Sequence, residues 1–245
     1  MKRNFILFTL VSLYYIAAFG QKKYEMVVEK NDGTEIVINT EDIVRTYFRE
    51  KNDGTTDDTE KPVAENAGEA IDLGLSVKWS SCNVGATNPE EYGGFYAWGE
   101  TSEKETYSWN TYIFAESEKV YNNLGEKICG TQYDVAHVKW GGSWRMPTIS
   151  EFKELVDKCS WTASVLNGVT GTLVTGPNGN SIFLPAGGRK YGSKGHRDAG
   201  EVGCYWSCSA DNDVYAKNLL VFGAETDLKD SRNRANGMLI RPVFE

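Results

Sequence analysis

Histidine is scarce in this sequence, with two copies, His137 and His196, among 245 residues. Neither has a serine or cysteine at a spacing typical of a nucleophile and its base. The many acidic residues offer no pair arranged like the two carboxyl groups of a glycoside hydrolase. Because no catalytic constellation is present, we expect a protein that is not an enzyme.

Basic charge is also in short supply. The chain has 26 Lys and Arg residues against 34 Asp and Glu residues, which gives a formal net charge of −8. This balance argues against binding to nucleic acid and to anionic membrane surfaces. Hydrophobic residues make up 40% and aromatic residues 12% of the chain. That content is sufficient for one packed domain of good size with smaller additions.

Long hydrophobic runs are missing except at the start of the chain. Lys2 and Arg3 precede a mostly apolar stretch at 5–17, and Ala18-Phe19-Gly20 resembles a cleavage site. The run is short for a membrane span. We therefore expect a cleaved signal peptide and an exported protein that is periplasmic, cell-surface-associated or secreted. Removing Lys2 and Arg3 would change the formal charge from −8 to −10.

The five cysteines are an odd number for an exported chain. Their spacing does not match a zinc site of two close pairs, and the sequence predicts no metal or cofactor. Free buried thiols are expected for most of them. If a disulfide is present, we favour Cys82 with Cys159, because each ends an apolar element expected to face the core. The others are Cys129, Cys204 and Cys208.

A hairpin is expected near the N-terminus. The stretches 24–30 and 34–40 flank Asn31-Asp32-Gly33, whose residue types tolerate the positive φ of tight turns. Residues 43–48 could add a strand. So small a β unit is marginally stable alone, and it must dock, pair with another chain or be partly mobile.

Composition divides the chain into four parts. Residues 1–20 are the predicted signal peptide and 21–48 the small β unit. Residues 49–69 are polar and rich in acidic residues, which predicts a flexible linker. The main domain is expected at 70–245.

The best-defined element of the main domain is a short helix after residue 147. Thr148 and Glu151 have the spacing of a capping box, and apolar residues then recur at helical intervals. Upstream, Gly141 and Gly142 lie between two tryptophans, which lets the backbone turn between large apolar anchors. We assign a structural role to Trp140, Trp144, Arg145, Thr148, Glu151, Phe152 and Leu155.

The rest of the domain is expected to consist mainly of short strands. Residues 71–79 alternate apolar and polar side chains. A first helix is expected at 133–140 with Asp134 near its start. One or two helices beside many short strands predict the α+β class. Further strands are expected at 95–98, 181–184, 205–206, 218–222 and 238–244, with a long polar excursion at 101–124 and a glycine-rich loop at 187–203.

Several motifs together resemble a known family. They are AIDLGLSVKWSSCNVGA (70–86), EEYGGFYAWGE (90–100), WGGSWRMPT (140–148), SIFLPAGGR (181–189), GCYWSCS (203–209) and RANGMLIRPV (234–243). In order and spacing they resemble the Fibrobacter succinogenes major paralogous domain, a secreted bacterial module. The resemblance implies a C-type-lectin-like fold, shared with sulfatase-modifying factors, with short twisted antiparallel strands. It leaves the ligand open.

The resemblance also suggests an enzymatic alternative. Formylglycine-generating enzymes, relatives by fold, carry a copper-binding cysteine pair at a similar late position, and Cys204 and Cys208 would be the pair here. Their spacing departs from that pattern, and two small residues filling a strand are the simpler interpretation. The calcium-dependent sugar motifs of lectins are absent. Asp211-Asn212-Asp213 is oxygen-rich but is better explained as a polar turn.

Ligand binding is the favoured function. In variable proteins of this fold, ligands contact the loops and strand faces of the C-terminal third. Tyrosine, asparagine and arginine suit such recognition because they combine ring area with adaptable hydrogen bonding. The ligand is expected to be an extracytoplasmic protein or glycan. The candidate residues are Asp211, Asn212, Asp213, Tyr215, Lys217, Asn218, Arg232, Asn233 and Arg234.

Overall fold

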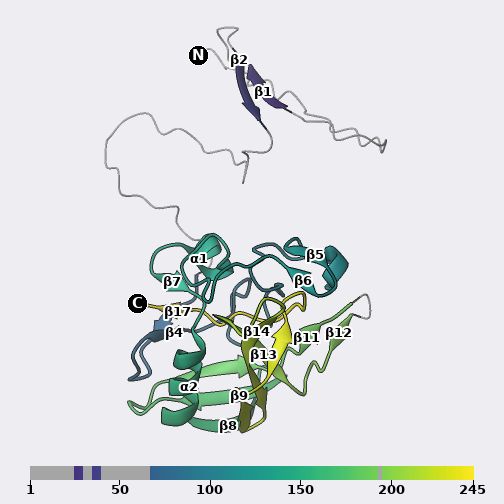
Figure 1. Cartoon of the computed structure of the whole chain (residues 1–245). Helices are drawn as coiled ribbons and strands as arrows, with labels where there is room; N and C mark the ends of the chain where they lie inside the picture. Colours follow the sequence, from purple (N-terminus) through teal and green to yellow (C-terminus); the bar gives the residue numbers. More distant parts are fainter. Residues whose placement is uncertain (1–24, 30–34, 40–66, 193–194) are drawn as a thin grey trace, which may run out of the picture. The chain divides into compact units, whose positions relative to one another are not determined.

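The computed structural model describes residues 25–29, 35–39, 67–192 and 195–245. The chain divides into two compact units, residues 1–56 and 57–245. In the first unit, β1 (Glu25–Glu29) pairs antiparallel with β2 (Glu35–Asn39), which confirms the predicted pair of strands (Figure 1). The predicted signal peptide, the possible strand at 43–48 and most of the predicted linker lie outside the described residues.

The second unit consists of short antiparallel strands and few helices, which confirms the α+β class. Its helices are η2 (Trp109–Thr111), α1 (Val135–Trp140) and α2 (Ile149–Lys158). Its strands are β3 (Ala70–Ile71), β4 (Lys78–Ser80), β5 (Ala115–Ser117), β6 (Val120–Tyr121), β7 (Trp144–Arg145), β8 (Ser160–Leu166), β9 (Val169–Thr175), β10 (Ser181–Pro185), β11 (Arg189–Lys190), β12 (His196–Arg197), β13 (Gly203–Ala210), β14 (Tyr215–Phe222), β15 (Glu225–Asp227), β16 (Ser231–Asn233) and β17 (Val243–Phe244).

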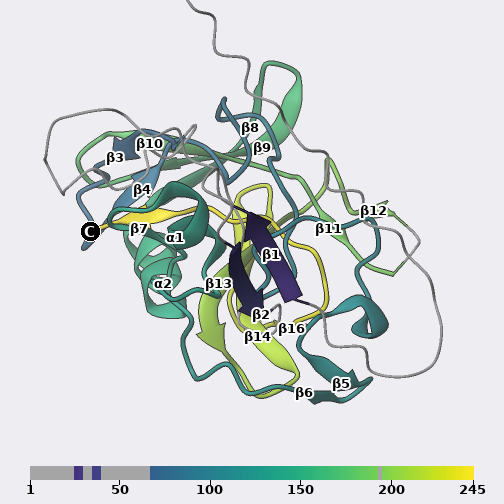
Figure 2. The ribbon, with the colours of Figure 1, turned by 90° about the horizontal axis from the view of Figure 1, so that it is seen from above.

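These strands form three main sheets. Their orders are β3-β4-β17-β7, β10-β9-β8 and β13-β14-β15, with β16 also paired to β14. Two small ladders, β5-β6 and β11-β12, stand apart from them. The final strand β17 lies between β4 and β7, so the two ends of this unit meet in one sheet. Figure 2 shows β13, β14 and β16 side by side, with the β5-β6 hairpin close to β16.

Aromatic side chains fill the core. Trp79, Trp98 and Trp206 are completely buried. The indole N–H of Trp98 donates to the Ser207 carbonyl at 2.9 Å, and that of Trp206 donates to the Tyr96 carbonyl at 3.0 Å. The Trp98 and Trp206 rings therefore contribute apolar burial while their polar groups stay satisfied, whereas the buried Trp79 N–H has no hydrogen-bond partner among the described residues.

The tryptophan anchors around β7 are buried as expected. Trp140 and Trp144 are 5% and 7% exposed, and their rings meet edge to face with centroids 5.1 Å apart. Phe152 and Leu155 of α2 are fully buried in the neighbouring core. The segment from Trp140 to Leu155 therefore packs against the interior both before and after the first residue of α2.

The predicted capping box of α2 is present. The Thr148 hydroxyl accepts from the Glu151 N–H at 3.2 Å, and the Glu151 carboxylate accepts from the Thr148 N–H at 2.7 Å. Arg145 donates to Glu151 and to Glu245, each at 2.6 Å. One guanidinium thus links β7, the start of α2 and the C-terminal residue.

This network predicts a pH dependence of stability. Burial alone would raise the pKa of Glu151, but hydrogen bonds from Arg145 and the Thr148 backbone hold that pKa below its usual value. A carboxyl with a lowered folded-state pKa stabilises the fold above its unfolded-state pKa and loses that contribution as the pH falls. We expect Glu151→Gln to lower the free energy of unfolding at pH 7, and this difference to shrink below about pH 4.

Urea unfolding at several pH values measures this difference. Asp157→Asn, at an exposed carboxylate of the same helix, is the control and is expected to have little effect at any pH. A Glu151→Gln deficit that stays constant down to pH 3 would contradict the assignment.

The hairpin formed by β8 and β9 is absent from the sequence-based expectations. Its turn is Asn167-Gly168, with φ of 49° and 84°. Positive φ at both turn positions is the geometry that Asn-Gly favours in two-residue hairpins. The flanking strands are rich in threonine and serine, so their alternation of apolar and polar residues is weak. The Asn167-Gly168 turn therefore indicates the hairpin more strongly than the sequences of its two strands do.

Several expected strands are shorter than predicted. Residues 71–79 do not form one strand, because the Asp72 carboxylate accepts from the Gly74 N–H at 2.7 Å and turns the chain between β3 and β4. Residues 95–98 contribute a single bridge, Tyr96 to Met238. Within 238–244 only β17 is a strand. In these segments, single residues pair with different neighbouring strands. An alternation of apolar and polar residues along the sequence cannot reveal such pairing.

The disulfide prediction was wrong. Cys129 and Cys208 are bonded, with Cα atoms 5.3 Å apart, whereas Cys82 and Cys159 are free. The loop before α1 runs beside β13, and the Ile128 N–H donates to the Cys208 carbonyl at 3.0 Å. This contact brings together residues that are 79 positions apart, and no local pattern encodes it.

Candidate functional site

An open groove lies where three parts of the chain meet. Its volume is about 510 Å³. One wall comes from η2 and the β5-β6 turn, one from the residues after β11, and one from the start of β14 and the segment after β16. The lining residues are Ser108, Trp109, Glu118, Lys119, Tyr121, Tyr191, Gly192, Val214, Tyr215, Asn233, Ala235 and Asn236. We call this the aromatic groove.

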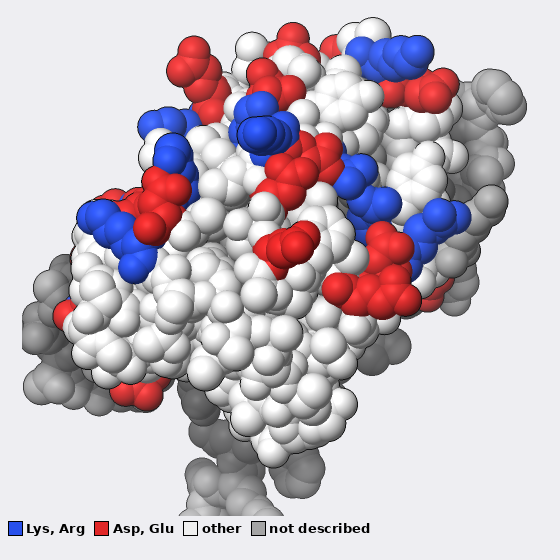
Figure 3. All heavy atoms as spheres, turned by 90° about the horizontal axis from the view of Figure 1, so that it is seen from below, with Lys and Arg blue, Asp and Glu red and all other residues white. Residues whose placement is uncertain are grey.

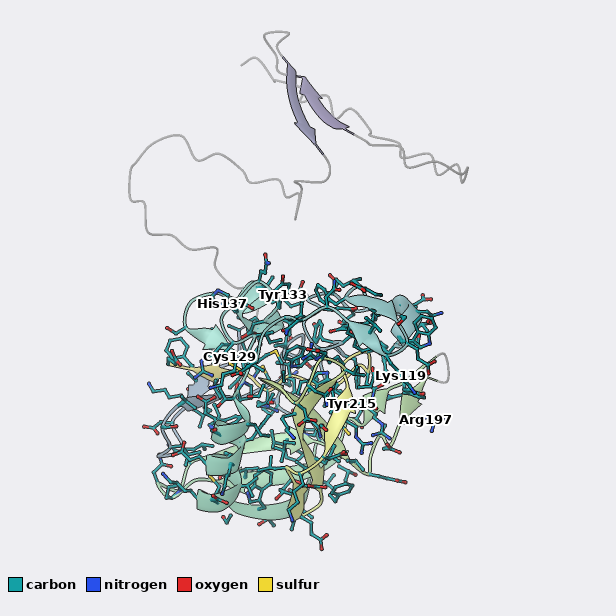
Figure 4. All side chains as sticks on the ribbon, in the orientation of Figure 1. Lys119, Cys129, Tyr133, His137, Arg197 and Tyr215 are labelled. Atoms are coloured by element: carbon teal, nitrogen blue, oxygen red, sulfur yellow. A yellow bond between two sulfur atoms is a disulfide. The ribbon has the colours of Figure 1, made fainter. Side chains whose placement is uncertain are left out.

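Exposed rings gather in the aromatic groove. Trp109 is 43% exposed, Tyr191 52% and Tyr215 42%. Only one further aromatic side chain among the described residues is as exposed, Phe222 at 43%. Rings of this size normally bury much of their surface, so three of them around one groove mark a contact surface. In Figure 4, Lys119 and Tyr215, which both line the groove, lie toward the same side of the domain.

Amide groups complete the groove. The Asn233 side-chain oxygen accepts from the Tyr121 hydroxyl and from the Ala235 N–H, both at 2.9 Å. Neither the Asn233 amide nitrogen nor the Asn236 amide has a partner within the described part of the chain. Burial raises the pKa of Tyr121, so its phenol is neutral at ordinary pH and can donate this bond. The groove therefore offers free amide donors and acceptors beside its rings.

Backbone pairing holds the three walls together. Tyr107 and Gly192 exchange N–H···O bonds of 3.4 and 2.6 Å, which fixes Gly192 against the residues before η2. Tyr215 pairs with Asn233 across the β14-β16 ladder. The Tyr121 hydroxyl then connects β6 to that ladder. Hydrogen bonds between its walls thus hold the groove together.

A smaller pocket of about 340 Å³ lies beside the turn between β13 and β14. Its lining includes Asp211, Asn212, Asp213 and Arg234. The Asn212 side-chain oxygen accepts from the Val214 and Tyr215 N–H groups, both at 2.9 Å, so residues 211–213 form the predicted polar turn. No group of three or more potential metal ligands occurs among the described residues.

Three basic candidates near this turn already have partners. Lys217 contacts Asp211 at 2.5 Å, and this bond lowers the pKa of Asp211. Arg232 contacts Asp230 at 2.5 Å. Arg234 is 1% exposed, with its guanidinium 4.3 Å from the centroid of the Trp98 ring. These contacts are the kind that support a local fold.

The predicted binding residues therefore separate into four groups. Tyr215 and Asn233 line the aromatic groove, and Asp211, Asn212, Asp213 and Arg234 line the smaller pocket. Lys217 and Arg232 line neither and form ion pairs. Asn218 is completely buried, because its side chain points inward from β14, and it is not part of any described surface.

Sequence reasoning missed most of the groove. Trp109, Tyr121 and Tyr191 lie in segments that were interpreted only as a polar excursion and a glycine-rich loop. Asn236 lies just beyond the predicted binding segment. Aromatic residues in otherwise polar, loop-rich sequence are typical of contact surfaces, and that signal was present.

The two cysteines of the enzymatic alternative do not form a thiol pair. Cys208 is bonded to Cys129. Cys204 is buried, and burial raises the pKa of its thiol to about 12. His137 lies in α1 and His196 in β12, and among the described residues neither is hydrogen-bonded to Cys204 or Cys208. Figure 4 places Cys129 near Tyr133 and His137, on the other side of the domain from Lys119.

Comparisons with protein-family models, with curated proteins and with solved structures found no match for this chain. Among the described residues, no helix has the length and apolar character needed to span a bilayer.

Proposed function

We propose that the second unit is a non-catalytic recognition module that binds neutral carbohydrate in the aromatic groove. The observation that carries this proposal is the meeting of three exposed rings, Trp109, Tyr191 and Tyr215, with the Asn236 amide and the free amide nitrogen of Asn233. The motif resemblance supports a major paralogous domain with a C-type-lectin-like fold. The N-terminal sequence supports export, so the ligand would be met outside the cytoplasm.

The chemistry of the groove favours an uncharged, hydroxyl-rich ligand. The C–H faces of a sugar ring are apolar and can pack on exposed aromatic rings. Sugar hydroxyls both donate and accept hydrogen bonds, as asparagine amides do. The two charged lining residues, Glu118 and Lys119, have opposite signs, so the groove has no excess of either charge. The groove therefore provides no electrostatic attraction for an acidic or a strongly basic ligand.

Binding to a microarray of neutral and acidic oligosaccharides, followed by calorimetry with the best neutral binder, tests this function. We expect Tyr215→Ala and Trp109→Ala each to weaken binding about tenfold, because each removes a ring that contacts the ligand. Phe222→Ala is the matched control, since Phe222 lies at the opposite end of β14 with almost the same exposure, 43% against 42% for Tyr215.

Equal binding by the wild type and both groove variants would overturn the assignment of the site. The absence of binding to any neutral glycan would overturn the ligand class. If a screen of surface proteins instead yields a binder that depends on Tyr215 and Trp109, the groove is a protein-recognition surface.

A further inference from the structure

Strand β8 has an open edge. It is the outer strand of the sheet β10-β9-β8. Leu166 and Val169 pair with each other on either side of the two-residue turn. The backbone N–H and C=O groups of Leu166, and of every second residue before it along β8, therefore point toward β9. The backbone groups of Trp161, Ala163 and Val165 therefore point away from β9, and none has a hydrogen-bond partner among the described residues.

The other long strands of this unit have covered edges. Along β13, the N–H groups of Trp206, Cys208 and Ala210 donate to carbonyls of three loops at 2.7 to 3.0 Å. Along β10, Arg241 and Tyr205 donate to the Phe183 and Pro185 carbonyls at 2.7 and 2.6 Å. Strand β8, with seven residues, has no such cover within the described part of the chain.

The sequence of the β8-β9-β10 sheet is also free of charge. From Ser160 to Gly188 the sequence contains no Asp, Glu, Lys or Arg. Figure 3 shows the domain from the side on which β8 lies in Figure 1, and a broad area there is without charged side chains. Val165 is 65% exposed on this strand. Edge strands normally carry charges or proline that prevent pairing, and β8 has neither.

We propose that β8 pairs antiparallel with β8 of a second copy of this chain, which forms a symmetric dimer. A two-fold axis at Ala163 aligns the outward-pointing residues with one another. Ala163 then faces Ala163 of the second copy, and Trp161 faces Val165 of the second copy. This register satisfies the open backbone groups of both strands and places the exposed valine against an indole.

The charge of the chain limits the surfaces through which a second copy can bind. The chain carries a formal net charge of −8, so two copies repel at most relative orientations. Contact through the uncharged β8-β9-β10 surface avoids placing like charges opposite each other. The sequence of β8 is also self-complementary about Ala163. Trp161, a large ring, lies two residues before Ala163, and the exposed aliphatic Val165 lies two residues after it.

The register can be tested by cross-linking the full chain. In Ala163→Cys the two new thiols face each other across the axis, at a separation that a disulfide can bridge. We expect mild oxidation to convert most of this variant to a covalent dimer. Thr162→Cys is the control, because this residue points its backbone toward β9 and does not face its own copy. Equal cross-linking of both variants, or none of Ala163→Cys, would overturn the proposal.

Sedimentation equilibrium over a concentration series measures the association itself. We expect a monomer–dimer equilibrium that Val165→Lys weakens roughly tenfold or more, since the symmetric contact receives the new charge twice. Ile113→Lys is the matched control, at a more exposed aliphatic residue (71%) outside β8, and should not change the equilibrium. A wild-type protein that stays monomeric at all concentrations would refute the dimer.

Discussion

Removal of the disulfide between Cys129 and Cys208 is expected to lower the free energy of unfolding by about 4 kcal/mol. The bond closes a loop of 79 residues, and such a cross-link restricts the unfolded chain strongly. It also ties the loop before α1 to the centre of β13. Urea unfolding of the wild type with and without reductant measures the effect, and Cys129→Ser should reproduce the result with reductant.

Two controls separate the disulfide from the other thiols. Cys159→Ser changes a half-buried free cysteine and should cost much less than Cys129→Ser. Thiol titration of the denatured, unreduced protein should find three free groups of the five cysteines, and all five after reduction. A stability that reductant leaves unchanged, or five thiols without reductant, would contradict the disulfide and make the copper-oxidase alternative worth testing with copper(I).

Replacement of Asp134 by alanine is expected to cost about 3 kcal/mol. This carboxylate is completely buried and caps α1. One oxygen accepts from the Ala136 and His137 N–H groups at 3.0 and 3.1 Å, and the other accepts from Gly130 and Met146, both at 2.9 Å. Burial raises the pKa of Asp134, and these donors act in the opposite direction. Alanine would leave four buried N–H groups without an acceptor.

Asparagine is a sharper probe of the same site. Its oxygen can replace one carboxylate oxygen, but its NH₂ group would then face two N–H donors. We therefore expect Asp134→Asn to destabilise the domain nearly as much as alanine does. Asp72→Ala, which removes an exposed carboxylate with a single backbone donor, is the control and should cost under about 1 kcal/mol. An Asp134→Asn variant with wild-type stability would show that the four N–H groups do not bind the Asp134 carboxylate.

Local features of the chain were predictable because their causes are local. The caps of α1 and α2 follow from a carboxylate or hydroxyl next to the first helical N–H groups, and Asp134 and Thr148 do occupy those positions. The strand pair β1-β2 follows from turn residues between two apolar runs. The same logic, applied to Asn167-Gly168, would have found the hairpin of β8 and β9.

The binding surface was only partly predictable. Tyr215 and Asn233 belong to the predicted C-terminal segment and do line the groove. Their polar neighbour Asn218 has the same amide chemistry, but its place on β14 turns it into the core. Which member of such a set faces a ligand depends on the pairing of β14 with β13 and β16, and composition carries no information about that pairing.

The α+β class, the capped helices and the tryptophan anchors could be predicted from local patterns, because hydrogen bonds and apolar periodicity act over a few residues. The bond between Cys129 and Cys208, the shared groove of Trp109, Tyr191 and Tyr215, and the open edge of β8 could be found only in the folded domain. Each of these depends on which distant segments become neighbours. The packing of the whole core sets those neighbours, and no short stretch of the chain specifies them.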